Sequence, residues 1–158
     1  MATIDVGSAA TNRSGVKAQN CTTIDYNNAA NNTGVLDTFK VWMNSDATNV
    51  IVGVFTNDGS GYFTNTDYEL IGDVASGSEQ TFTGKNCSVS SGQFVGLYTL
   101  TGQVEADTSG YSGVYIDPGN NFGGGSVSYG FGGGDCISLY ATGATAAAGN
   151  PYYYYLNQ

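Results

Sequence analysis

Histidine is absent from the 158-residue chain, and its absence limits the chemistry that the sequence can support. Without histidine, Ser-His-Asp and Cys-His nucleophilic sites cannot be built in their usual form, and no histidine-ligated metal site can form. A pair of carboxylates, as in glycoside hydrolysis, is the remaining catalytic option. Glu105 and Asp107 lie two apart on a predicted strand and share one face, about 7 Å apart. Two acids on the exposed face of a strand more often prevent aggregation, so we expect no enzymatic activity.

Turns rich in aspartate, asparagine and glycine offer the oxygen ligands that calcium prefers. Three aspartates in or near such turns are weak candidates for calcium binding: Asp58, Asp117 and Asp135. None of these turns has the ligand spacing of an EF-hand, and Asx-turn hydrogen bonding accounts for the same residue types. The sequence therefore predicts no cofactor, with calcium as the open alternative.

Aromatic side chains are the second group of candidate binding residues, because the chain contains 12 Tyr and 7 Phe. Tyrosine rings can stack on sugars, but they also fill protein interfaces and the margins of sheets. Four aromatic residues lie in or beside predicted loops, where glycan sites on β-sandwiches often form. These candidate glycan contacts are Tyr62, Phe63, Tyr111 and Tyr115.

Two segments near the C-terminus have compositions that favour self-association. In the run 152–156, alternation of side chains along an extended chain would expose one aromatic face in a monomer, unless the run is disordered. In the glycine-rich segment 122–134, regularly interleaved aromatics favour packing against a neighbour, and a flexible loop is the alternative. A second copy of the chain is the simplest partner, so we expect a homo-oligomer, with a trimer as the expected state. The candidate self-association residues are Tyr152, Tyr153, Tyr154, Tyr155, Leu156, Phe122, Tyr129 and Phe131.

Charge and composition exclude several classes of partner. The formal net charge is −9, and the four basic residues form no cluster, which argues against binding to nucleic acid or to an anionic membrane. No apolar run approaches the length of a transmembrane helix, so no membrane insertion is expected. The N-terminal residues do not resemble a signal peptide, as expected for a virion protein that leaves the cell by lysis.

The elements that must position these residues are predicted to be strands, because Asn, Ser and Gly disfavour helices and Thr favours strands. Turn signals recur about every ten residues, and no segment shows helical periodicity, which predicts an all-β antiparallel sandwich or barrel of eight to ten strands. In the strand 35–43, the side chains expected on one face are Val35, Phe39, Val41 and Met43. The predicted strands are 3–6, 21–26, 35–43, 50–55, 68–74, 79–83, 94–100, 103–107, 113–117 and 137–141.

The domain organisation predicted from these strands is one sandwich followed by a short tail. The sandwich is expected over residues 1–143, with residues 1–20 as an arm or an edge strand. Residues 144–158 form an aromatic tail that is expected to pack on a neighbouring subunit.

The three cysteines, Cys21, Cys87 and Cys136, have spacings that fit no zinc signature. They are interpreted as small buried hydrophobic residues, with one disulfide and a leftover thiol as the alternative. The sequence does not select which pair would bond.

Several blocks of the sequence resemble strands of jelly-roll-like β-sandwiches found in phage and metagenomic phage-like virion proteins. The blocks are 34–42 (GVLDTFKVW), 52–55 (VGVF), 77–82 (GSEQTF), 91–98 (SGQFVGLY) and 103–110 (QVEADTSG). Gln93 stands where these domains usually carry Asp, so no role of that acid is transferred. The resemblance covers roughly residues 3–117, and it implies a jelly-roll-like sandwich of the capsid decoration, head fibre or tail-fibre type.

Together, the residues and the resemblance predict a non-enzymatic structural or assembly protein of a phage virion or a similar extracellular assembly. Its expected partners are further copies of itself and other virion or shell proteins, and its expected location is the virion or the extracellular space. The alternative is a glycan-binding module, either a lectin or a carbohydrate-binding domain, that recognises a cell-surface glycan.

Overall fold

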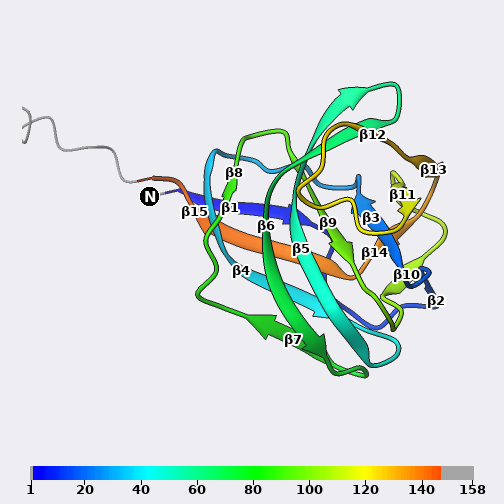
Figure 1. The fold of residues 1–158 in the computed structure, drawn as a ribbon. Coiled ribbons are helices and arrows are strands. Elements are labelled where there is room, and N and C mark those ends of the chain that lie inside the picture. Colours follow the sequence, from blue (N-terminus) through cyan, green and yellow to red (C-terminus); the bar gives the residue numbers. More distant parts are fainter. Residues whose placement is uncertain (1, 147–158) are drawn as a thin grey trace, which may run out of the picture.

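A computed structural model describes residues 2–146, and within this range the secondary structure consists of strands joined by turns, with no helix (Figure 1). The all-β fold class is therefore confirmed, and eight strands have five residues or more, within the predicted number. These are β1 (Thr3–Gly7), β3 (Cys21–Asp25), β4 (Gly34–Trp42), β5 (Ala47–Gly59), β6 (Tyr62–Val74), β9 (Phe94–Tyr98), β11 (Val114–Pro118) and β15 (Leu139–Ala144). The shorter strands are β2 (Gly15–Val16), β7 (Glu79–Phe82), β8 (Cys87–Val89), β10 (Glu105–Asp107), β12 (Val127–Ser128), β13 (Gly130–Gly132) and β14 (Cys136–Ile137).

The strands form an antiparallel β-sandwich, as predicted. One sheet has seven strands in the order β12-β6-β5-β9-β3-β11-β13. The facing sheet has the order β1-β15-β4-β7, and β8 also pairs with β4. A small third sheet has the order β14-β10-β2. In Figure 1 the long hairpin of β5 and β6 lies in front of β4 and β15, so the two main sheets form the layers of the sandwich.

The main core lies between these two sheets. Strand β5 is central in its sheet, between β6 and β9, and its alternate residues are buried on both faces. Val52 and Val54 point into the main core, whereas Phe55 belongs to a second cluster on the outer face of the seven-stranded sheet. This burial on both faces explains the uninterrupted apolar run that predicted a central strand.

A β-bulge in β4 changes the predicted core face of this strand. Thr38 pairs with Thr142 and Leu36 pairs with Gly143, so Asp37 is the extra residue. As a result Leu36 joins Phe39 in the core, and Val35 is only half-buried, contrary to the alternation expected from the sequence.

The N-terminal segment is an edge strand rather than an arm. Strand β1 pairs with β15 along its whole length, and the side chains of Ile4 and Val6 are fully buried. On its open side, Asp5 N donates to the side-chain oxygen of Asn31 (3.0 Å), and the Asn31 amide nitrogen donates to Thr3 O (3.4 Å). One asparagine side chain therefore pairs with the edge of the sheet as a peptide group would.

Strand β8 is also capped by side chains along its open edge. Backbone amides on this edge would otherwise be free to pair with another chain. The caps come from side chains of β6 and of the turn before β9, so they also join the two sheets. The pairs are Asn86 N with Glu69 Oε1 (2.8 Å), Ser88 N with Asp67 Oδ2 (2.8 Å) and Ser90 N with Gln93 Oε1 (2.7 Å).

The two ends of the described chain lie side by side (Figure 1). Thr3 pairs with Ala144, and backbone and side-chain bonds link Ala2 with Thr145. The last strand of the sandwich thus ends at Ala144, one residue beyond the predicted boundary. The predicted association residues Tyr152 to Leu156 lie outside the described residues.

Candidate functional site

A shallow groove of about 440 Å³ lies on the outer face of the seven-stranded sheet. Leu70 is 66 % exposed and Leu100 is 43 % exposed, so two large apolar side chains that line this groove meet solvent. Exposed apolar side chains that gather on one surface mark interaction sites more reliably than isolated ones do. The groove is lined by Asn49, Val50, Ile51, Leu70, Gly72, Tyr98, Leu100 and Asn120.

The register of three neighbouring strands builds the floor of this groove. Ile51 of β5 lies opposite Leu70 of β6 on one side and opposite Tyr98 of β9 on the other. Residues that pair across antiparallel strands point to the same face, so these three side chains form one apolar row. The hydroxyl of Tyr98 is held by the side-chain oxygen of Asn20 at 2.9 Å, which fixes the ring at the floor.

The next row of paired residues contains two glycines, so it has no side chains at these two positions. Gly53 lies opposite Gly96 on β9 and opposite Tyr68 on β6. A Cβ atom on Gly53 would lie 2.9 Å from the ring of Phe122, so this ring occupies the space that a side chain would need. Gly53 thus lets the segment after β11 pack onto the sheet, where it supplies Asn120 to the groove.

The groove has amide groups but no charged lining residue. Asn49 adopts a left-handed backbone conformation (φ 50°), which asparagine tolerates better than most residues. The side-chain oxygen of Asn120 accepts a hydrogen bond from Phe122 N (3.0 Å), and its amide nitrogen takes no part in that bond. With an apolar floor, amides and no acid or base, this groove suits binding rather than proton transfer.

The glycine-rich segment packs on its own sheet, and the burial of Tyr129 corrects its prediction as an association residue. Tyr129 is buried, and its ring lies 5.8 Å from Phe63 and 6.3 Å from Phe55. The ring of Phe122 is half-buried at 5.1 Å from Phe55. Phe131, by contrast, is 56 % exposed and stays available to a partner.

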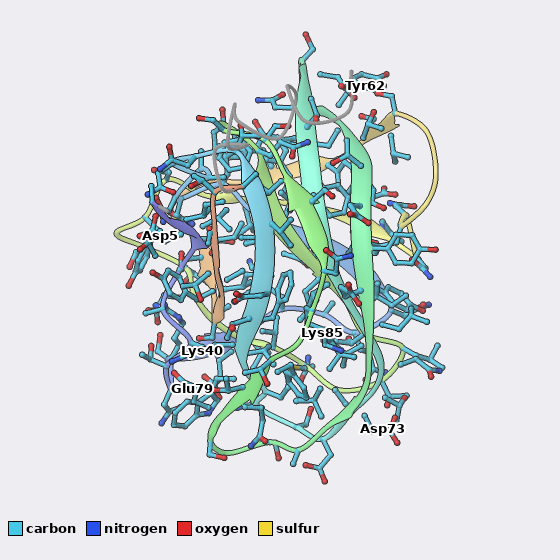
Figure 2. The ribbon with its side chains drawn as sticks, turned by 90° about the vertical axis from the view of Figure 1, so that its left-hand side faces the viewer. Asp5, Lys40, Tyr62, Asp73, Glu79 and Lys85 are labelled. Atoms are coloured by element: carbon cyan, nitrogen blue, oxygen red, sulfur yellow. The ribbon has the colours of Figure 1, made fainter. Side chains whose placement is uncertain are left out.

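The predicted glycan contacts are not assembled into one exposed surface. Phe63 is fully buried in the aromatic cluster, which overturns its prediction as a contact, and Tyr115 packs against it at 4.7 Å. Tyr62 is exposed at one end of the molecule, far from Asp73 at the other end of β6 (Figure 2). Tyr111 is exposed but lies under the Arg13 guanidinium, 5.3 Å from the ring centre.

The sequence prediction missed Leu70 and Leu100 as site residues. In the predicted strands 68–74 and 94–100, both occupy positions where alternation points away from the main core, and an apolar residue at such a position is the signal that could have identified them. Their proximity could not be read from the sequence, because it depends on the register of β6 against β5 and β9.

The paired acids of β10 do not face solvent together, contrary to the prediction. Glu105 is buried, and its two oxygens accept bonds from Arg13 N (2.8 Å) and from the Asn44 amide (2.8 Å). Asp107 accepts bonds from the Arg13 guanidinium and from Ser14. The hydrogen bond from the Ser14 amide is the largest effect that lowers the pKa of Asp107 below its usual value, and the bond from Arg13 acts in the same direction. The pair thus anchors the N-terminal segment instead of protecting an edge.

The three aspartates proposed for calcium are engaged in separate contacts. The bonds to Asp58 lower the pKa of its carboxyl. Among residues 2–146 no group of three or more acidic or cysteine side chains is placed to hold a metal ion, and calcium binding stays a prediction. The Thr64 and Ser126 hydroxyls donate to Asp58, the Asn121 amide donates to Asp117, and Lys17 forms an ion pair with Asp135.

The three cysteines are free thiols, consistent with the interpretation as small hydrophobic residues rather than with a disulfide. Cys87 and Cys136 are buried, and Cys21 is half-buried. Burial, with the nearby carboxylates of Asp67 and Glu69, raises the pKa of Cys87 to about 12, so this thiol is protonated and unreactive near neutral pH.

Asp25 is a buried acid whose removal is expected to stabilise the protein. Its Oδ1 accepts a bond from Asn27 N (3.0 Å), its Oδ2 is buried without a hydrogen bond of good geometry, and burial raises the pKa of this carboxyl although Ser8, Asn27 and Ile137 offset part of the rise. A carboxyl whose pKa is raised by folding contributes to stability at a pH below its usual pKa near 3.8. This stabilising contribution is lost as the pH rises through the pKa of the folded state. At pH 7 we expect Asp25→Asn to raise the free energy of unfolding by roughly 1–2 kcal/mol.

Urea unfolding of both proteins between pH 3.5 and pH 8 measures this difference. The gain should be small at the acid end and grow as the pH rises. The exposed Asp73 provides the control, because Asp73→Asn should leave the free energy of unfolding nearly unchanged. An equal gain at every pH would show that the ionised Asp25 carboxylate is not the cause.

Comparisons of the chain with protein-family models, with curated proteins and with solved structures give no match. Within residues 2–146 there is no helix that is long and apolar enough to span a membrane.

Proposed function

We propose that this protein is a non-enzymatic structural or assembly component of a phage virion or a similar extracellular assembly, and that it associates with further copies of itself. The observation that carries the proposal is the uncharged groove, which exposes Leu70 and Leu100 to solvent. In a protein with a formal net charge of −9, an uncharged apolar surface is where a second copy can approach with the least repulsion.

Two features of the sequence support the same proposal. The tyrosine run 152–155 is a second apolar segment, and it carries no charge. The resemblance of residues 3–117 to jelly-roll-like virion domains supports the virion or extracellular setting, with other virion or shell proteins as further partners. A trimer is the proposed oligomer.

Light scattering after size-exclusion chromatography tests the self-association. At micromolar concentrations we expect the full chain to elute as a homo-oligomer with about three times the monomer mass of 16.3 kDa. The quadruple variant Tyr152→Ser, Tyr153→Ser, Tyr154→Ser and Tyr155→Ser should elute as a monomer, because its tail has lost its apolar surface. A full chain that is monomeric at all concentrations would overturn the proposal.

A glycan-binding module is the second candidate function, and the groove also provides the observation that favours it. Tyr68 is 44 % exposed two residues before Leu70 on β6, and the amides of Asn49 and Asn120 line the groove. An exposed ring can stack on a sugar, and amides can bond to its hydroxyl groups. A glycan array distinguishes this candidate from self-association, as described below.

A further inference from the structure

We propose that the groove on the seven-stranded sheet receives the aromatic segment 151–156 from a neighbouring copy of the chain. This inference rests on the proposed self-association, and it names both of the surfaces that meet. The groove is the one on the outer face of this sheet whose lining residues, including Asn49 and Asn120, are given above. The segment is the sequence Pro-Tyr-Tyr-Tyr-Tyr-Leu within the tail.

The chemistry of the two surfaces is complementary. All the lining residues of the groove are uncharged, and residues 147–158 contain no Asp, Glu, Lys or Arg. Most other surfaces of so acidic a protein would meet a partner with like-charge repulsion, and this pair of surfaces avoids it. Tyrosine suits the groove, because its ring covers apolar side chains such as Leu70 while its hydroxyl bonds to amides such as those of Asn49 and Asn120.

The spacing of side chains also matches. In an extended segment, alternate residues point to one side about 7 Å apart. Tyr152, Tyr154 and Leu156 would therefore face one surface together. Leu70 lies on β6 and Leu100 in the turn after β9, with β5 between them, so an extended segment crossing the groove contacts both.

The position of the groove favours a neighbouring copy over the same chain. Strand β15 lies in the five-stranded sheet, and its last residue, Ala144, pairs with Val35 at the start of β4. The groove lies on the outer face of the other sheet, where β5 begins after β4 has ended. A tail reaching its own groove must therefore pass round the sandwich and also run along it.

The length of the tail makes that route unfavourable. Passing β4 and β8 at about 4.8 Å a strand and crossing to the other sheet at about 10 Å uses about 20 Å. Ser88, which pairs with Val35, bonds to Asp67, so the run along β6 from Asp67 to Leu70 adds about 10 Å more. The chain from Ala144 to Tyr152 spans at most about 28 Å when fully extended. Binding to its own groove would need a taut chain laid across the surface, whereas the groove of a neighbour imposes no such limit.

Groove variants of the full chain provide the test. Leu70→Asn combined with Leu100→Asn adds polarity to the groove, and the fold should survive because both side chains are largely exposed. The matched control is Tyr62→Ser, which removes an exposed aromatic side chain at the far end of the β5–β6 hairpin (Figure 2). Circular dichroism and thermal melting confirm that each variant is folded.

Two measurements are made on these proteins. Light scattering gives the oligomer mass of each full-length variant. Fluorescence anisotropy gives the affinity of a labelled peptide of residues 147–158 for the quadruple tyrosine variant, with and without the two groove substitutions. We expect the groove substitutions to abolish oligomers and to weaken peptide binding at least tenfold, and the Tyr62→Ser control to change neither.

Three other outcomes would overturn the inference. If oligomers and peptide binding survive the groove substitutions, self-association stands but uses another surface. If the peptide binds the groove while the full chain is monomeric at all concentrations, the tail occupies the groove of its own chain. If the peptide does not bind, and a glycan array gives hits that the groove substitutions abolish, the groove is a sugar site.

Discussion

Replacing Arg13 with alanine is expected to destabilise the fold by about 3 kcal/mol, because it removes four hydrogen bonds and takes a partner from the buried Ser138 hydroxyl and the half-buried Asp107 carboxylate. The Arg13 side chain is only 5 % exposed, and every nitrogen of its guanidinium group is bonded. The Asp107 side chain is 27 % exposed and keeps some contact with water. The expected loss of stability therefore lies at the lower end of the range for breaking a buried ion pair. The acceptors are Ser138 Oγ (2.8 Å), Asp107 Oδ2 (2.9 Å), Tyr111 OH (2.9 Å) and Ala9 O (2.7 Å).

The effect is large because Arg13 holds an irregular segment in place. The chain between β1 and β3 contains only the two-residue strand β2, so few ladder hydrogen bonds fix its position. Arg13 ties this segment to β10 through Asp107 and to Ser138, which lies between β14 and β15. Arg13→Lys should recover only part of the loss, since an ammonium group cannot reproduce the planar fork of bonds.

Urea denaturation at pH 7 measures the loss, and a surface ion pair provides the control. Lys40 and Glu79 face each other on β4 and β7 at 3.3 Å, with side chains 38 % and 40 % exposed (Figure 2). Lys40→Ala should cost less than about 1 kcal/mol, because exposed ion pairs contribute little. If the two alanine variants lose equal stability, the Arg13 network does not anchor the fold.

A single methyl group on Gly53 should destabilise the protein by about 3 kcal/mol, near the upper end for overpacking. Its Cβ atom would lie 2.4 Å from Asp67 O and 2.8 Å from Tyr68 Cβ, on the neighbouring strand. A backbone oxygen cannot move away as a flexible side chain can, so β5 and β6 would have to separate locally. The Phe122 ring would be displaced as well, since it lies 2.9 Å from the same point.

The glycine-rich segment supplies a matched control for this prediction. A Cβ atom on Gly125 would meet no atom within 4 Å, and Gly125→Ala should change the free energy of unfolding by less than about 0.5 kcal/mol. Near-UV circular dichroism of Gly53→Ala should also lose aromatic signal, because the Phe122 contact with Phe55 is disturbed. Equal stability of the two variants would contradict the close packing at Gly53.

Strand identity could be predicted from the sequence where local patterns decide the structure. The apolar run 50–55 predicted a central strand, and it lies inside β5 with both faces covered. The β4 bulge could not be predicted, because it depends on Gly143 in a distant strand. A Cβ atom there would lie 1.9 Å from Val35 O, so only glycine allows β15 to approach β4.

Burial on the outer face was less predictable, because it depends on contacts between distant segments. The sequence shows that Phe63 follows a turn, but not that Tyr129 from the glycine-rich segment covers it. For the same reason Glu105 was predicted to be exposed, although Arg13 and Asn44 enclose it. Composition predicted a binding rather than a catalytic surface, whereas the location of the groove required the register of β5, β6 and β9.

The two ends of the described chain lie at the same end of the sandwich, so its two ends differ. Thr3 and Ala144 pair at the pole where β4 begins, whereas the turn that contains Asp46 lies beyond the end of β4 and bonds to Ser76. A cargo fused at either end would leave the domain at one pole, and the turns at the other pole would remain uncovered. The same adjacency would let a short linker join residues 2 and 145, so that the chain could be opened at the exposed Ser60–Gly61 hairpin instead.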